Sequence, residues 1–265
     1  MESLIHMNEF RRRPAESVLT KFAMRVVSEL ARSDRIETGK PHSDVMHLLI
    51  QHCKTGEQST LSELYSEIRH RGISAEQVID VYFPAASDWI GAQWHECEID
   101  ILETSIALAR LQMLLRELGR AMASDRAGQR DGHCVLLTLP AGEQHTLGAM
   151  IAANQLRRSG VSVKLSFAPN PLEMQKLMRE SRFSAVFVSF ANRSNLASGA
   201  DLIKRARDYS GRELLVVCGG GIVAEMGQML SSVELAAQLG ADLATTSIPD
   251  AIAFIGNQVK HYAAE

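Results

Sequence analysis

The second half of the chain alternates short apolar runs with longer amphipathic stretches, and this alternation constrains the fold more than any other feature. Strands are predicted over residues 134–139, 162–167, 185–190, 214–218 and 243–247, and the first of them contains an apolar run typical of a buried parallel strand. Helices are predicted over residues 147–158, 172–179, 196–209, 223–228 with 233–239, and 250–261. Strands joined by right-handed helical crossovers form a doubly wound parallel sheet. We therefore predict a five-stranded α/β domain over residues 133–265.

The preceding segment, residues 41–123, has the pattern of a helical bundle. Apolar stripes at helical spacing predict four helices, over residues 44–54, 61–70, 75–94 and 99–122. Pro84 should kink or split the third helix. The buried side of the fourth helix is marked by Leu108, Leu111, Leu115, Leu118 and Met122. Residues 124–132 contain no apolar residue larger than alanine, so we place the boundary between bundle and sheet there.

Residues 1–40 form a third region, a tail followed by one amphipathic helix that begins near Pro14. The apolar stripe of this helix must cover a neighbouring helix, a partner protein or a second copy of the chain. Arg11–Arg13 precede it and offer charge for phosphate or an acidic partner. A polar linker is predicted at residues 33–43.

Composition narrows the class of protein. A net charge of -3 argues against a general nucleic-acid binder. The four cysteines show no CxxC pairing, which favours reduced thiols over a zinc site or a disulfide framework. No apolar run approaches the length of a membrane span, and the N-terminus lacks the apolar core of a secretion signal. We expect a cytoplasmic protein.

The loop after the first predicted strand carries Glu143, His145 and, three residues later, Gly148. A carboxylate near a histidine can accept the proton of one ring nitrogen and leave the other nitrogen free to coordinate a metal. Gly148 removes a side chain where a large ligand could lie against the backbone. An isolated loop histidine is the plainer interpretation of the same residues.

Other polar or glycine-rich loops follow the third, fourth and fifth strands, and begin with Ser189, with Gly219 and Gly220, and with Thr245. Open α/β sheets bind ligands at this edge. A nicotinamide-binding domain would carry GxGxxG after the first strand. That motif is absent there, as is a Walker A loop, so neither a dinucleotide nor a nucleoside triphosphate is the expected ligand.

The ExHxxG motif of Glu143, His145 and Gly148, followed by Ser189 and by Gly219-Gly220, resembles the cobalamin-binding domain of methyltransferases, mutases and light-sensing regulators. The resemblance implies a flavodoxin-like sheet and makes His145 the lower axial ligand of cobalt, with Glu143 as its partner. It also implies that Ser189, Gly219 and Gly220 line a channel for the nucleotide tail of the cofactor.

A bundle before the sheet is also characteristic of that family, where it covers the upper face of cobalt. Within residues 90–105, Trp94 resembles the tryptophan of the upper face. CarH-like light-sensing domains have a Glu-His pair about ten residues later, where this chain has Thr104 and Ser105. The upper ligand is therefore open, with other bundle histidines as candidates: His95, His70, His52 and His47.

The resemblance to cobalamin-binding proteins covers residues 41–265, and the chain as a whole resembles the AerR/PpaA group of photosynthesis-gene regulators. The resemblance implies a non-enzymatic, cobalamin-binding antirepressor that responds to light or redox state. Its partner would be a PpsR/CrtJ-type transcriptional repressor, through which it would associate with DNA. The alternatives are a corrinoid methyl carrier, a haem-binding sensor and a scaffold without cofactor. The cobalamin form (hydroxo-, methyl- or adenosyl-) and the oligomeric state are not fixed by sequence.

Overall fold

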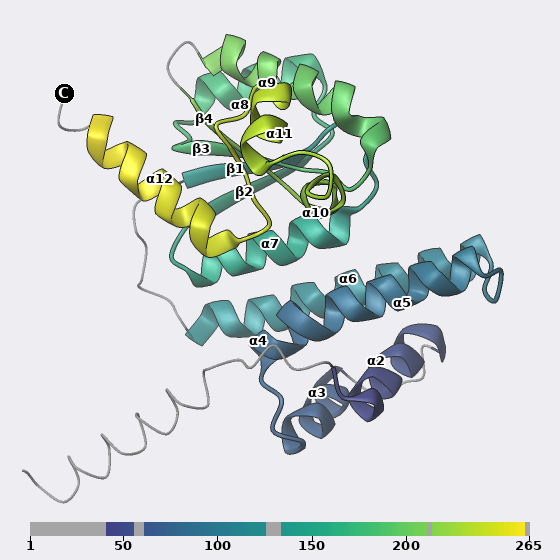
Figure 1. The fold of residues 1–265 in the computed structure, drawn as a ribbon. Coiled ribbons are helices and arrows are strands. Elements are labelled where there is room, and N and C mark those ends of the chain that lie inside the picture. The colour runs from purple at the N-terminus through teal and green to yellow at the C-terminus, as the bar shows by residue number, and fades with distance from the viewer. Residues whose placement is uncertain (1–40, 56–60, 126–133, 211–213, 263–265) are drawn as a thin grey trace, which may run out of the picture. The chain divides into compact units, whose positions relative to one another are not determined.

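A computed structural model describes residues 41–55, 61–125, 134–210 and 214–262. The predictions for residues 1–40, including the amphipathic helix and Arg11–Arg13, lie outside the described residues. Residues 41–265 belong to one compact unit, and Figure 1 labels its α-helices and the first four of its strands.

The first part of this unit is helical, as predicted. It contains α2 (Ser43–Thr55), α3 (Leu61–His70), α4 (Ala75–Gln77), the π-helical segment η1 (Val78–Tyr82), α5 (Phe83–His95) and α6 (Ile101–Asp125). The predicted stripe on α6 is the buried one, since Leu111, Leu115 and Leu118 pack into the bundle core and Leu108 packs against it.

The predicted third helix is interrupted before Pro84. Proline has no N–H, so the carbonyl four residues earlier, that of Asp80, loses its normal helical partner. The Phe83 N–H donates to the carbonyl of Val78, five residues earlier, and the chain passes through a π turn before α5 begins. The interruption therefore takes the form of a π segment.

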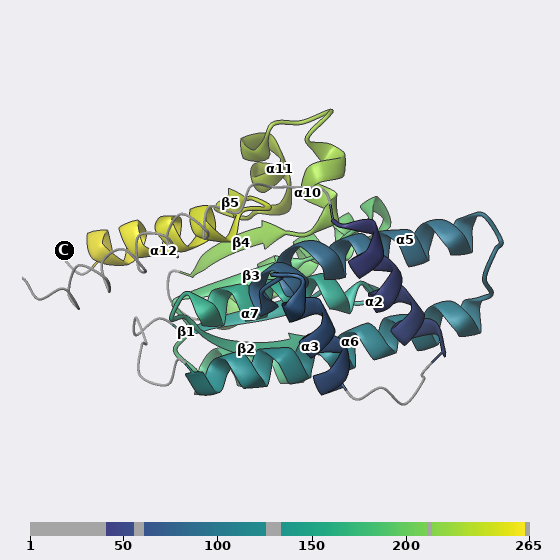
Figure 2. The same ribbon diagram turned by 90° about the horizontal axis from the view of Figure 1, so that it is seen from below.

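The sheet has five parallel strands in the order β2-β1-β3-β4-β5. They are β1 (Cys134–Leu139), β2 (Ser162–Phe167), β3 (Ala185–Ser189), β4 (Leu215–Gly219) and β5 (Leu243–Ala244), and they follow one another in that order in Figure 2. This is the flavodoxin-like order, which confirms the predicted fold class. The fifth strand is shorter than predicted, because the Thr245 hydroxyl accepts a hydrogen bond from the Ser247 N–H and turns the chain.

Helices cover both faces of the sheet. On one face lie α7 (Thr146–Arg158) and α12 (Ile248–Tyr262). On the other lie α8 (Pro171–Glu180), α9 (Leu196–Ser210), α10 (Gly221–Met226) and α11 (Ser232–Leu239). A 3-10 turn, η2 (Arg193–Asn195), precedes α9.

Helix α7 joins the sheet to the bundle and lies between them in Figure 1. Its Ala149, Ala153 and Leu156 pack into the core of the sheet, whereas Leu147 and Ile151 belong to the bundle core. The bundle and the sheet are therefore packed against one shared helix. Helix α6 ends at Asp125, inside the stretch that was predicted to separate them.

Two expectations from composition can be compared with the structure. Cys53 and Cys218 are buried thiols, Cys134 is half-buried and Cys97 is exposed. Within the described ranges, no helix combines the length and the apolar character that crossing a bilayer requires.

Candidate functional site at the carboxyl edge of the sheet

Glu143 and His145 lie in the loop between the end of β1 and the start of α7. Strand β1 is flanked by β2 on one side and β3 on the other, so the crossovers from β1 and from β3 leave the sheet in opposite directions. This reversal is the topological switch point at which open α/β sheets bind ligands. His145 itself occupies the N-cap position of α7.

The Glu143 carboxylate is buried and fully hydrogen-bonded. One oxygen, Oε1, accepts from the His145 backbone N–H at 2.9 Å and lies 2.5 Å from the Nδ1 atom of the His145 ring. The other, Oε2, accepts from the Ala191 N–H at 2.8 Å and from the Asn195 side-chain amide at 3.0 Å. Glu143 therefore ties the loop after β1 to the loop after β3.

These contacts keep the carboxylate charged and orient the imidazole. Burial alone would raise the pKa of Glu143, but the hydrogen bonds from Ala191, His145 and Asn195 outweigh it and lower the pKa to about 2. An ionised carboxylate can only accept, so Nδ1 carries the proton in the Glu143–His145 contact. In the neutral ring the lone pair then resides on Nε2. Because 57% of the His145 side chain is exposed, this arrangement suits coordination of an external metal.

The glycines of the predicted motif differ in their surroundings. A Cβ atom built on Gly148 would meet nothing within 4 Å, which fits open space beside the backbone of α7. A Cβ on Gly219 would lie 3.0 Å from the Thr245 carbonyl oxygen. At Gly220 it would lie 2.5 Å from the Phe190 carbonyl oxygen, and the φ of Gly220 is +97°.

Glycine at 220 is thus required by its backbone conformation and by the packing of the loop after β3, whereas a Cβ at 219 would need a small shift of the Thr245 carbonyl. Whether these residues also line a channel for a nucleotide tail stays a prediction. Ser189 is half-buried and pairs in register with Gly219. Thr245 donates its N–H to the Cys218 carbonyl. The strand ends therefore bring Ser189, Gly219, Gly220 and Thr245 to the edge of the sheet that carries Glu143.

The bundle presents exposed apolar side chains near the junction of α5 and α6. Trp94 is 44% exposed and is not part of the bundle core, and its ring lies 5.1 Å from that of His95. At the start of α6, Ile101, Leu102 and Ile106 are also exposed. Figure 1 shows that α5 and α6 continue past the start of α7, so this junction extends beyond the sheet edge.

Thr104 and Ser105 occupy the positions of the Glu-His pair in the light-sensing domains. Their hydroxyls donate to the carbonyls of Asp100 and Ile101, one helical turn earlier. Both side chains are therefore engaged within α6. The other candidate upper ligands are scattered over the bundle: His47, His70 and His95 are exposed, and His52 is half-buried. Within the described part of the chain, no three His, Cys, Asp or Glu side chains gather as a metal-binding group.

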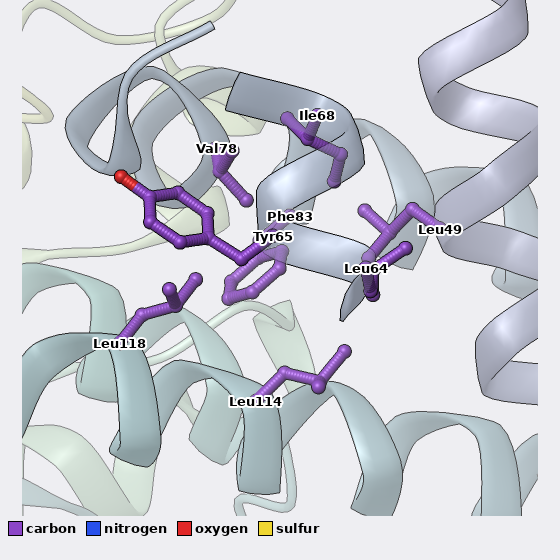
Figure 3. Close-up of a pocket in the computed structure, with 8 residues that line it drawn as sticks. All are labelled: Leu49, Leu64, Tyr65, Ile68, Val78, Phe83, Leu114 and Leu118. Carbon is purple, nitrogen blue, oxygen red and sulfur yellow. The ribbon is translucent and has the colours of Figure 1, made fainter. Parts of the chain in front are cut away.

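A small apolar pocket lies elsewhere, inside the bundle (Figure 3). It is lined by Leu49, Leu64, Tyr65, Ile68, Val78, Phe83, Leu114 and Leu118. None of these is a predicted site residue. The pocket is a packing gap between helices and is separate from the Glu143–His145 site.

Two groups that hold Glu143, the Asn195 side chain and the Ala191 N–H, were not predicted from the sequence, and neither was the contact between Gln112 and Thr146. Asn195 could have been noticed as an amide side chain in the loop after the third strand, six residues beyond Ser189. The Ala191 N–H carries no side-chain signal, and the pairing of Gln112 with Thr146 spans 34 residues.

Comparison with known proteins identifies a family. No protein-family model matches the chain. The chain is 36% identical over 185 residues to an uncharacterized 20.5 kDa protein in the bchF-crtJ intergenic region of Rhodobacter capsulatus. The match covers 70% of this chain and 93% of the relative. The chain therefore belongs to the family of that Rhodobacter protein.

Two solved structures show a distant likeness. One is described as a novel cobalamin-binding protein from Desulfitobacterium hafniense DCB-2, with a TM-score of 0.39, 16% identity and coverage of 80% of this chain and 97% of that one. The other is the methanol:cobalamin methyltransferase complex MtaBC from Methanosarcina barkeri, with a TM-score of 0.39, 14% identity and 94% coverage of both chains. Neither adds to what the strand order already establishes about the fold.

Proposed function

We propose that the chain binds a cobalamin, with His145 as the lower axial ligand of cobalt. The observation that carries the proposal is the Glu143–His145 pair. The buried carboxylate fixes the proton on Nδ1, and Nε2 keeps its lone pair on a partly exposed ring at the switch point of the sheet. Open space at Gly148 supports the approach of a large ligand.

The exposed apolar side chains at the junction of α5 and α6 support the same proposal. Trp94, Leu102 and Ile106 provide apolar and aromatic surface suited to the face of a corrin ring. Bound cobalamin would supply a cobalt whose upper ligand exchanges in response to light or redox state.

We further propose that the chain acts as an antirepressor of photosynthesis genes and does not itself catalyse a reaction. Its partner would be a PpsR/CrtJ-type repressor. The location of its Rhodobacter relative in the bchF-crtJ region supports this role. A signal that fully switches such a protein between two conformations must favour one of them by about 5.5 kcal/mol. Coordination of cobalt by His145 can supply a free energy of that size.

The ligand assignment is tested with hydroxocobalamin and the purified chain. The wild type should retain the corrinoid through gel filtration and show its visible absorption. His145→Ala should bind at least about tenfold more weakly, a change of about 1.4 kcal/mol. His42→Ala is the matched control, since His42 is an exposed histidine just before α2 and is not a candidate ligand, and it should bind as the wild type does. Undiminished binding by His145→Ala would refute the assignment of His145 as the ligand. A haem absorption spectrum from the purified protein would show that the cofactor is haem and not cobalamin.

The regulatory proposal requires a separate assay. The PpsR/CrtJ-type repressor of the same genome is bound to its operator, and the cobalamin-loaded chain is added in darkness and after illumination or reduction. We expect release of operator DNA in one state only, and no release with His145→Ala. Operator binding that is insensitive to the loaded chain in every state contradicts the antirepressor role. Methyl transfer by the loaded chain with an activating partner would support a methyl carrier instead.

A further inference from the structure

A hydrogen bond connects the bundle directly to the loop that carries His145. The side-chain amide of Gln112, in the middle of α6, donates through Nε2 to the Thr146 hydroxyl at 2.9 Å. Thr146 is the residue after His145 and the first residue of α7. The contact is partly buried.

The backbone of His145 therefore lies between two anchors on different parts of the protein. On the sheet side, Glu143 holds the ring through Nδ1 and the backbone through the His145 N–H, and is itself held by Ala191 and Asn195. On the bundle side, Gln112 holds Thr146. The first anchor fixes the orientation of the imidazole, and the second fixes the start of the helix from which it projects.

Further contacts hold α7 to the bundle along its length. Leu147 and Ile151 are buried in the bundle core. At Gly119 of α6 a Cβ would lie 2.7 Å from the Asn154 amide nitrogen of α7, so the two helices approach closely. Near the end of α7, the Asp80 carboxylate accepts from Gln155 at 3.1 Å and from Arg158 at 2.5 Å.

These contacts differ in their distance from the proposed metal ligand. Gln155 lies ten residues beyond His145, and its bond to Asp80 fastens the far end of α7. Gln112 contacts the residue next to His145. A displacement of His145 toward or away from a metal would act on the Gln112–Thr146 contact before it acted on the Asp80 contacts.

We propose that Gln112 is a positioning residue for His145, acting through Thr146, and that this contact couples the lower ligand to helix α6. The inference rests on the proposed function, because it assigns a role in presenting the metal ligand. In this arrangement the bundle covers the cofactor and also positions its lower ligand. The helix that extends beyond the sheet edge is joined by one side chain to the loop that would hold cobalt from below.

The experiment compares Gln112→Ala with its matched control, Gln155→Ala, which also removes a glutamine that links α7 to the bundle. Hydroxocobalamin affinity is measured first. The fraction of histidine-coordinated cobalt is then read after reduction to cob(II)alamin. It is the part of the nitrogen splitting in the electron paramagnetic resonance spectrum that changes when the protein is labelled with ¹⁵N, because the cofactor's own base also gives nitrogen splitting. Gln112→Ala should bind three- to tenfold more weakly and lose part of the splitting, as expected for one hydrogen bond. Gln155→Ala should stay within about twofold of the wild type.

Two further variants separate positioning from general destabilisation. Gln112→Glu should recover most of the affinity, because the Thr146 hydroxyl can donate to a carboxylate. Thr146→Val should weaken binding as Gln112→Ala does, and the double variant Gln112→Ala/Thr146→Val should be no worse than either single variant. Additive losses, or equal losses in Gln112→Ala and Gln155→Ala, would overturn the inference.

A measurement without cofactor keeps this inference distinct from the proposed function. Amide hydrogen exchange at residues 143–147 should be faster in Gln112→Ala than in Gln155→Ala when both are compared with the wild type. If the wild type fails to bind cobalamin, the proposed function falls, and the exchange data still decide whether Gln112 orders the loop. If the wild type binds but exchange and spectrum do not respond to Gln112→Ala, the positioning role alone is wrong.

Discussion

Replacing Glu143 by Gln should change how the stability of the cofactor-free protein depends on pH. The carboxyl pKa of Glu143 lies at about 2 in the folded protein, against an ordinary value of 4.5. This depressed pKa corresponds to about 3 kcal/mol of stability. Because the folded state binds the proton less readily than the unfolded state, the stabilisation is fully present above pH 4.5 and is lost as the pH falls toward 2.

The expected slope can be worked out for an accessible range. Between pH 7 and pH 3.5, the wild type should lose about 1.4 kcal/mol more unfolding free energy than Glu143→Gln, which has no proton to gain at this position. At pH 7 the variant should be less stable by about 1–3 kcal/mol, since the neutral amide cannot accept all the hydrogen bonds that the carboxylate accepts. The two stability curves should therefore converge as the pH falls.

Urea unfolding at pH 7, 6, 5, 4 and 3.5, followed by circular dichroism, provides the measurement. Glu180→Gln is the matched control, since Glu180 is an exposed carboxylate at the end of α8. Its curve should run parallel to that of the wild type. Parallel curves for Glu143→Gln and the wild type would show that the Glu143 carboxylate is not held in the charged state by Ala191, His145 and Asn195.

Three other substitutions test separate parts of the structure. Gly220→Ala should lower the free energy of unfolding by about 1–3 kcal/mol in thermal denaturation. The φ of residue 220 is +97°, and the new Cβ would lie 2.5 Å from the Phe190 carbonyl oxygen. An unchanged melting temperature would contradict this packing. Gly148→Ala should leave the fold intact or stabilise α7 by up to about 1 kcal/mol. The same variant should weaken corrinoid binding if the ligand lies against Gly148, and an unchanged affinity would argue against a contact between the ligand and Gly148. Asp80→Ala should lower the free energy of unfolding by about 1–3 kcal/mol in urea, since it removes the partner of two α7 side chains. The control is Asp201→Ala, which removes an exposed ion pair and should cost less than about 0.5 kcal/mol. Equal losses in the two variants would show that the Asp80 contacts stabilise the protein no more than an exposed ion pair does.

The order of elements was predictable from sequence because strand and helix periodicities differ. The first and second strands were predicted at the residues where they occur. The first is a short apolar run, and the second alternates polar residues with Val163, Leu165 and Phe167. The fifth strand was predicted too long. Thr245 and Thr246 have high strand propensity, but the Thr245 hydroxyl bonds to the Ser247 N–H, and this local turn overrides propensity.

The candidate site was only partly visible in the sequence. Glu143 and His145 are separated by two positions, so their contact could be expected from spacing. The contacts of Glu143 with Asn195 and of Thr146 with Gln112 join residues 52 and 34 positions apart. They depend on the register of β1 against β3 and on the packing of α6 against α7, which no local pattern encodes.

The π segment at Val78–Tyr82 has a consequence for how this family varies in length. A π turn accommodates one residue more than the corresponding turn of an α-helix. Asp80, the partner of Arg158, lies within that turn. Deleting a single residue here would let the chain continue as a regular α-helix without rotating the helix on either side, because the π turn already absorbs the extra residue. Relatives that are one residue shorter at this point should therefore keep the packing faces of both flanking helices, and an alignment that places the gap elsewhere in this helix would pair the wrong residues.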